Sequence, residues 1–105
     1  MKKTIFISTI LIFMGTLFAA VIYVPDDYST INDAINAANI DDEIIVRDGT
    51  YLINGNQLIS VSGLTLRSEN GASSCVIDFN QNPSSFIINA SSVIIDGLAF
   101  KNSTG

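Results

Sequence analysis

The sequence contains no histidine and no tryptophan, one cysteine, and few basic residues. Without histidine, the chain has no imidazole for acid–base catalysis or for the usual zinc sites. A single cysteine, Cys75, excludes an intrachain disulfide. Its place in an apolar strand pattern predicts a buried hydrophobic side chain rather than a reactive thiol. These absences remove several common classes of enzyme and metal protein.

Basic residues are scarce: five lysines and arginines oppose ten acidic residues, and two of the five lie within the first three positions. If residues 1–20 are removed, Arg47, Arg67 and Lys101 face all ten carboxylates, which gives a net charge of −7. Such a chain repels phosphate, so nucleic acid is excluded as a partner. The acidity fits a solvated extracellular surface.

The start of the chain resembles an export signal. Two lysines precede an uncharged run from Ile5 to Val24, which includes the small residues Ala19 and Ala20. This order is that of a secretory signal peptide, with cleavage expected after Ala20, although the third residue before that cut is the bulky Phe18. The alternative is an uncut membrane anchor, because about 20 apolar residues can span a bilayer.

The stretch Val21–Val24 favours cleavage. It alternates and is rich in β-branched and aromatic residues, which predicts a strand. Because a strand of a soluble sheet cannot also lie in lipid, we expect residues 1–20 to be a signal peptide and residues 21–105 to form one secreted or cell-surface domain. Membrane contact is expected only through the signal segment, if it stays uncut.

One helix is predicted over about residues 30–38. Thr30 is a favourable N-cap, and Asp33 three residues later supplies a variant capping box. Small apolar residues then recur with helical spacing, which predicts a narrow stripe lying on a flat apolar surface. The stripe consists of Ile31, Ala34, Ile35 and Ala38. We therefore expect this helix to cover the end of a larger structure.

The rest of the chain consists of short alternating segments separated by turn residues, a pattern typical of all-β solenoids, sandwiches and barrels. The expected strands are Glu43–Val46, Leu58–Val61, Leu64–Arg67, Cys75–Phe79, Phe86–Asn89, Val93–Asp96 and Leu98–Lys101. The expected turns are Asp48-Gly49, Asn54-Gly55-Asn56, Ser62-Gly63, Asn70-Gly71, Asn80-Gln81-Asn82-Pro83 and Asp96-Gly97.

Two observations favour a solenoid. The segment Val61–Gly71 aligns position by position with Ile95–Gly105, and the interval between the two lies in the range typical of stacked repeats. Alternation also predicts a consistent inward set that could form one continuous core. This set is Leu64, Leu66, Cys75, Ile77, Phe79, Phe86, Ile88, Val93, Ile95, Leu98 and Phe100. Gly63 and Gly97 are expected at the corners between strands.

Four segments of the sequence together resemble the N-terminal region of pectate lyase-like proteins with the pectin lyase fold. These segments are Val24–Ile31, Ala34–Ala38, Glu43–Tyr51 and Val93–Asn102. The resemblance implies a right-handed parallel β-helix solenoid closed by an N-terminal capping α-helix. One departure is Arg47-Asp48 before Gly49, where members of this family commonly have proline. Similar N-terminal segments occur in lyases, hydrolases, esterases and proteins without a known reaction, so the resemblance implies a fold and not an activity.

Weak metal-site candidates are Asp78 and Asp96, which alternation places on the outer surface, with Arg67 and Lys101 as the basic candidates of the chain. Carboxylates on neighbouring coils could bind Ca²⁺ or act as an acid–base pair. However, both aspartates precede turn residues, where aspartate normally bonds its own backbone. The favoured interpretation is therefore that they form turns, and no catalytic residue and no cofactor is assigned. The acidic run Asp41–Glu43 is expected to be a solvated turn.

Two functions follow as hypotheses. The first is a non-enzymatic exported module that binds polysaccharide or serves a structural or adhesive role. The second is the N-terminal fragment of a secreted polysaccharide lyase or glycoside hydrolase whose catalytic coils lie beyond residue 105. Solenoids need caps at both ends, and the last repeat-like segment, Val93–Asn102, lies at the very end of this chain. We therefore expect an incomplete stack whose C-terminal edge pairs with further β-helix coils or with another chain.

Overall fold

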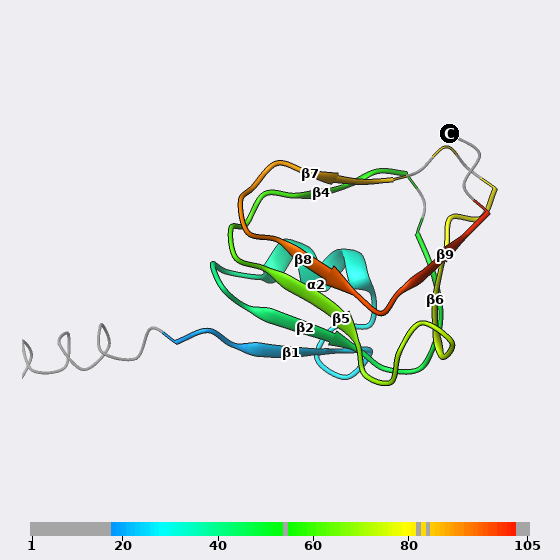
Figure 1. Cartoon of the computed structure of the whole chain (residues 1–105), viewed down its shortest axis with the longest axis horizontal. Helices are drawn as coiled ribbons and strands as arrows, with labels where there is room; N and C mark the ends of the chain where they lie inside the picture. The colour runs from blue at the N-terminus through cyan, green and yellow to red at the C-terminus, as the bar shows by residue number, and fades with distance from the viewer. Residues whose placement is uncertain (1–17, 54, 82, 84, 103–105) are drawn as a thin grey trace, which may run out of the picture.

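All strands of the chain pair in parallel. In the computed structural model, which describes residues 18–53, 55–81, 83 and 85–102, the elements in chain order are β1 (Val21–Val24), α2 (Ile31–Ala37), β2 (Glu43–Val46), β3 (Gly49–Leu52), β4 (Gln57–Ile59), β5 (Thr65–Ser68), β6 (Cys75–Asp78), β7 (Phe86–Ile88), β8 (Ile94–Asp96) and β9 (Ala99–Lys101). They form a sheet of order β1-β2-β5-β8, a sheet of order β3-β6-β9 and the pair β4-β7. The three sheets surround one interior (Figure 1).

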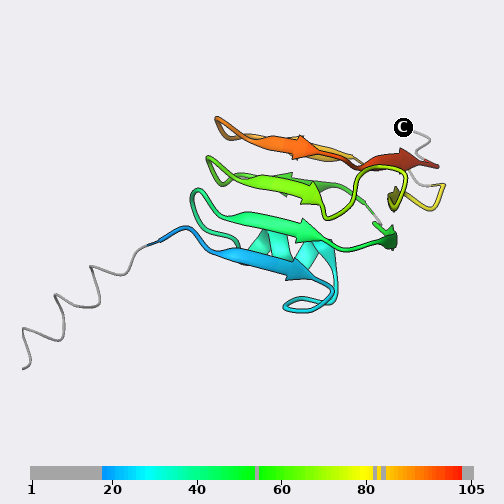
Figure 2. The same ribbon diagram turned by 60° about the horizontal axis from the view of Figure 1, so that its bottom comes forward.

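Each turn of the chain, here called a coil, adds strands to the sheets in order, so the chain is a parallel β-solenoid of about three turns. Figure 2 shows the coils stacked from β1 through β2 and β5 to β8. The helix α2 contacts β1, β2 and β4 at the start of the stack. An all-β solenoid with a helix over its first coils is therefore confirmed.

The helix begins and packs as its sequence predicts. The Thr30 hydroxyl accepts a hydrogen bond from the Asp33 backbone N–H at 3.1 Å, which is the expected N-cap. The apolar stripe is buried, with exposed fractions between 0% for Ala34 and 7% for Ala38. The polar side is also used, because Asn32 and Asn36 bond the buried Gln57 of β4 at 2.6 and 3.2 Å. These hydrogen bonds between side-chain amides attach α2 to the coil that contains β4.

The inward alternation is confirmed in the first coils. In the large sheet Leu66 pairs with Ile44 below and Ile95 above, and both Ile44 and Leu66 are fully buried. Cys75 and Ile77 of β6 are equally buried. We call each such vertical row of inward side chains a column. Columns of aliphatic residues build the continuous core that a single coil could not form.

The outermost coil follows the same columns but is only partly covered. Ile88 pairs with Ile59, and Phe100 pairs with Ile77, so both occupy inward positions as expected. Yet Ile88 is 48% exposed and Phe100 47%, whereas Ile59 and Ile77 are fully buried. The difference arises because, within the described residues, no coil follows the one that carries β7, β8 and β9.

The chain does repeat as a solenoid, but the register expected from the alignment of Val61–Gly71 with Ile95–Gly105 is wrong. That alignment matched β5 with β9, which belong to different sheets, whereas Leu66 of β5 stacks on Ile95 of β8. Both β5 and β9 follow a corner glycine, Gly63 or Gly97, with φ of +78° and +71°. Because β5 and β9 both follow such a glycine, similarity between two sheets was mistaken for similarity between coils.

The strand β3 was not among the expected strands, since Asp48-Gly49 was assigned to a turn. Its residues show no clear alternation: Tyr51 is half-buried, while Gly49, Thr50 and Leu52 are exposed. The strand exists because its backbone pairs with β6, from Gly49 opposite Cys75 to Leu52 opposite Asp78. Tertiary pairing here overrides a weak local pattern.

Candidate functional site

Asp78, one of the two metal candidates, completes a turn. It ends β6, and its Oδ1 accepts hydrogen bonds from the Asn80 backbone N–H at 2.8 Å and from the Asn102 amide at 2.9 Å. The bond from Asn102, helped by the bond from Asn80 and by the charge of Lys101, holds the pKa of Asp78 below its ordinary value. These contacts match the turn-forming interpretation of this residue.

Asp96, the second candidate, lies at the exposed end of β8 opposite Arg67 of β5. The Arg67 guanidinium donates to the Glu43 carboxylate one coil below. That bond is the main cause of a raised pKa for Arg67, and the charge of Asp96 adds to it. The acidic run Asp41–Glu43 is therefore not the solvated turn that was expected, because Glu43 forms an ion pair and Asp42 is buried, while Asp41 alone of the three is exposed.

The structure does not bring the two aspartates together. Asp78 belongs to the sheet of β3, β6 and β9, while Asp96 belongs to the sheet of β1, β2, β5 and β8. Instead, each lies opposite a basic candidate in the adjacent coil: Lys101 beside Asp78, and Arg67 beside Asp96. Opposite charges across neighbouring strands stabilise a sheet. Within residues 18–102, apart from the few left undescribed, no group of three acidic or cysteine side chains gathers as a metal site would require.

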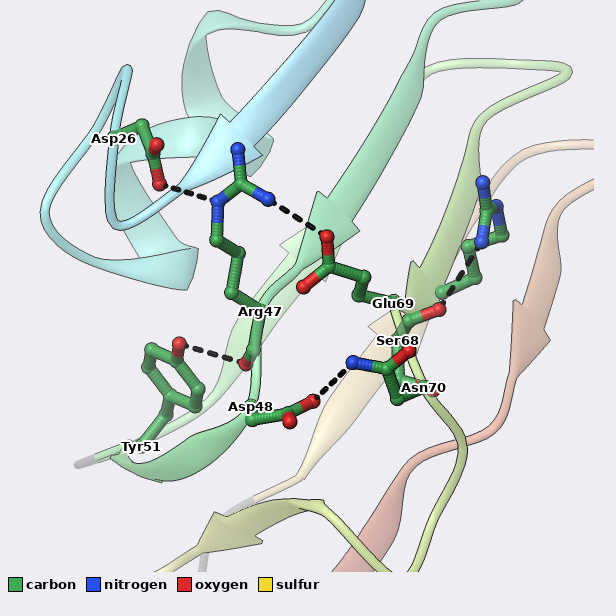
Figure 3. Close-up of polar contacts among 8 residues, drawn as sticks. Asp26, Arg47, Asp48, Tyr51, Ser68, Glu69 and Asn70 are labelled. Carbon is green, nitrogen blue, oxygen red and sulfur yellow. Dashed lines mark hydrogen bonds and ion pairs between the residues drawn. The ribbon is translucent and has the colours of Figure 1, made fainter.

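A cluster of polar contacts surrounds Arg47, which the sequence did not single out as a site residue (Figure 3). Its Nε donates to Asp26 at 2.9 Å, and its Nη1 donates to Glu69 at 2.7 Å. Its guanidinium carbon also lies 4.5 Å from the centre of the Tyr23 ring, a cation–π contact. A single side chain therefore connects three successive coils.

This cluster had a signal in the sequence. Asp26 and Glu69 lie 21 and 22 residues from Arg47, close to the spacing at which β1, β2 and β5 follow one another. Charged residues at the coil period are expected to meet on one face of a solenoid. An ion-pair network therefore holds the turn at Arg47.

Other turn residues also bond between coils. Asn70 donates to Asp48 at 3.0 Å, as Figure 3 shows, and Ser85 donates to Asn56 at 3.1 Å. The Tyr51 hydroxyl donates to the Arg47 carbonyl oxygen at 2.9 Å across the turn before β3. These side chains hold the turns in place as structural contacts.

The shifted pKa values have their causes in ion pairs, hydrogen bonds and burial. The Arg47 hydrogen bond holds the pKa of Asp26 below its ordinary value, and the Asp26 bond raises the pKa of Arg47. Burial raises the pKa of the Cys75 thiol and of the Tyr51 hydroxyl. Each of these pKa values moves away from neutral pH, whereas that of a general acid or base is usually shifted toward it.

The burial of Cys75 gives a direct prediction. Its side chain is fully buried and its pKa is raised, so we expect the thiol in the folded protein to react with a thiol-specific reagent at least about 100-fold more slowly than in urea. Because this is the one cysteine of the chain, absorbance of the released reporter measures it alone. Labelling at equal rates in folded and unfolded protein would contradict its placement.

A hollow at the start of the stack is lined by Phe18, Ala19, Asn39, Ile40 and Asp41. Phe18 and Ile40 are 81% and 68% exposed, so the wall is open to solvent. The first two lining residues belong to the segment expected to be removed on export. Such a cut would leave only Asn39, Ile40 and Asp41 of its lining.

A scan against protein-family models and searches of curated proteins and of solved structures find no match. Among the described residues, no helix has the length and apolar character needed to cross a bilayer. Most of the expected signal segment, residues 1–17, lies outside the described residues. The fold is therefore assigned from the strand pairing in the structure alone.

Proposed function

We propose that this chain is a structural module of an exported parallel β-helix: a capped end with first coils on which further parallel coils stack. One observation carries the proposal. In two columns the lower residue, Ile59 or Ile77, is fully buried, while the residue above it, Ile88 or Phe100, is about half exposed. The outermost coil thus presents an apolar surface shaped by the same columns, while α2 covers the opposite end.

The backbone supports the same proposal. Each of the three sheets ends in a strand of the outermost coil, β7, β8 or β9, with no further partner among the described residues. Parallel edge strands of this kind pair readily with an added strand. Because each column already contains aliphatic and aromatic side chains, a further parallel coil is the occupant that would continue both the hydrogen bonds and the core.

The charged side chains fit a structural role. Arg47 and Arg67 are engaged in ion pairs between coils, and Asp78 is engaged in a turn.

We propose in addition that the module is related to pectate lyase-like right-handed β-helix proteins. The capping helix that follows the phrase Val24–Ile31 supports this relation, and the signal-like start of the chain supports secretion.

The exposed edge can be tested with a matched pair of variants on β7. Ile88 points inward at the open end, whereas Ile87 points outward and is similarly exposed, at 45%. We expect the exported chain to self-associate through the open coil, Ile88→Lys to weaken association at least about tenfold, and Ile87→Lys to leave it nearly unchanged. Sedimentation over a range of concentrations measures the association.

Two results would contradict the structural role. One is a monomer at all concentrations with equal behaviour of both variants, which would show that the open coil attracts no strand. The other is release of unsaturated products when the exported chain is incubated with pectic polysaccharides. That result would assign a lyase activity to these coils.

A further inference from the structure

Asp42 is a buried carboxylate at the junction of three segments. Its residue is 3% exposed. Oδ1 accepts from the Ala20 backbone N–H and Oδ2 accepts from the Asn39 backbone N–H, each at 2.8 Å. Its own carbonyl oxygen accepts from the Thr65 N–H at 3.0 Å. Asp42 thus connects the residue before β1, the loop after α2 and the start of β5.

The charge of this carboxylate has no cationic partner among the described residues. The ion pairs found there join Arg47 to Asp26 and Glu69, and Arg67 to Glu43. A buried carboxylate that is bonded only by neutral amides is costly, and a positive charge within hydrogen-bond distance would lower that cost. The nitrogen of Ala20 already lies at that distance.

We propose that export cleaves the chain between Ala19 and Ala20, and that the new α-ammonium group of Ala20 forms an ion pair with Asp42. Water adds across the peptide bond: its hydroxyl forms a carboxyl group on Ala19, and the proton goes to the Ala20 nitrogen. That amine takes a second proton from solvent at neutral pH and becomes an ammonium. The inference depends on the predicted export signal and is independent of the proposed role of the open coil.

A cut after Ala20, as the small-residue rule alone suggested, would cost the fold two contacts. It would remove the Ala20 N–H that bonds Asp42, and also the Ala20 carbonyl oxygen that accepts from the Glu43 N–H at 2.9 Å. A cut one residue earlier keeps both groups. The residue just before the cut is still an alanine, Ala19. The third residue before the cut becomes Leu17 instead of the bulkier Phe18.

The surroundings of Ala20 suit a chain end. Phe18, Ala19 and Ala20 belong to no helix or strand and are exposed, with Phe18 at 81%. The body therefore loses little packing when Phe18 and Ala19 leave. A charge-assisted bond between an ammonium and a carboxylate is roughly twice as strong as one between neutral groups. Cleavage at this bond would thus strengthen the contact that anchors β1.

The cleavage site is read directly on the natural sequence. The whole chain is expressed in a secreting bacterium, and the exported protein is analysed by N-terminal sequencing and intact mass. We expect the first residue to be Ala20. A mature protein that begins at Val21, at any other residue, or at Met1 on a membrane would overturn the proposal. A cut at another residue leaves the proposed role of the open coil standing, and only the uncut Met1 form also bears on the export that the proposed function includes.

The ion pair has its own readout, the titration of the α-amino group by NMR. An adjacent carboxylate favours the charged form, so the pKa of this amine should lie above its ordinary range of about 7.7–8.0. Asp41 and Glu43 flank Asp42, and Glu43 is held by Arg67. Asp42→Asn should return the amine to the ordinary range, while Asp41→Asn serves as the matched control. Equal titration in both variants would contradict the pairing.

Discussion

Replacing Leu66 by alanine is expected to lower the free energy of unfolding by about 2–5 kcal/mol. Leu66 is fully buried in the middle of the large sheet, with Ile44 below and Ile95 above in the same column. Truncation would leave a cavity that both neighbours border, and each coil contacts only the coils next to it. Because a small domain is stable by roughly 5–15 kcal/mol in all, this loss takes a large share.

The matched control is Ile94→Ala on the neighbouring strand. Ile94 pairs with Thr65 on the outer face of the same sheet and is 55% exposed, so its loss should cost about 1 kcal/mol or less. Urea unfolding followed by circular dichroism measures both variants. Equal losses for the two variants would mean that the inward and outward faces of this sheet are assigned wrongly.

The faces of the strands could be predicted from the sequence because alternation is a local property. Side chains of a strand point to opposite faces in turn, so one buried residue fixes its neighbours. Leu64, Leu66, Cys75 and Ile77 were expected inside, and all four are fully buried. The helix was equally predictable, since its cap and its apolar stripe lie within one short segment.

The stacking of the coils could not be predicted in the same way. Which strand lies on which depends on the length of the loops between them, and these lengths vary. The large sheet shows this directly, because the interval from Leu66 to Ile95 is longer than the interval from Ile44 to Leu66. Sequence similarity alone therefore selected β5 and β9, two strands from different sheets. A variable period hides the register even where each strand is recognised.

The polar contacts between coils could not be predicted either, because they depend on which strands stack on each other. Asp78 and Asp96 were correctly placed at outward strand ends, but their neighbours across the coils, Lys101 and Arg67, follow from pairings that only the fold specifies. Arg47 was noted merely as a departure from a family pattern. With the spacing of the first coils known, its contacts to Asp26 and Glu69 would have been expected.

Replacing Phe79 by alanine is expected to cost about 3–5 kcal/mol and to release the outermost coil first. Phe79 directly follows β6 and is 4% exposed. Its ring stacks on Phe100 with centres 5.9 Å apart and planes at 10°, and it meets the edge of Phe86 at 6.3 Å and 73°. These three rings join the last two coils, so their contacts hold β7 and β9 to the stack.

The control is Phe100→Ala, which removes the outer member of the same stacked pair. Phe100 is 47% exposed and loses less burial, so about half the effect of Phe79→Ala is expected. Urea unfolding gives the two free energies, and hydrogen exchange of the amides in β7 and β9 shows where protection is lost. In a solenoid, coupling runs between neighbouring coils, so in Phe79→Ala protection should fall in β7 and β9 before it falls in β2. If protection falls equally in all three strands, the stack unfolds as one unit and the aromatic cluster does not set the stability of its last coil.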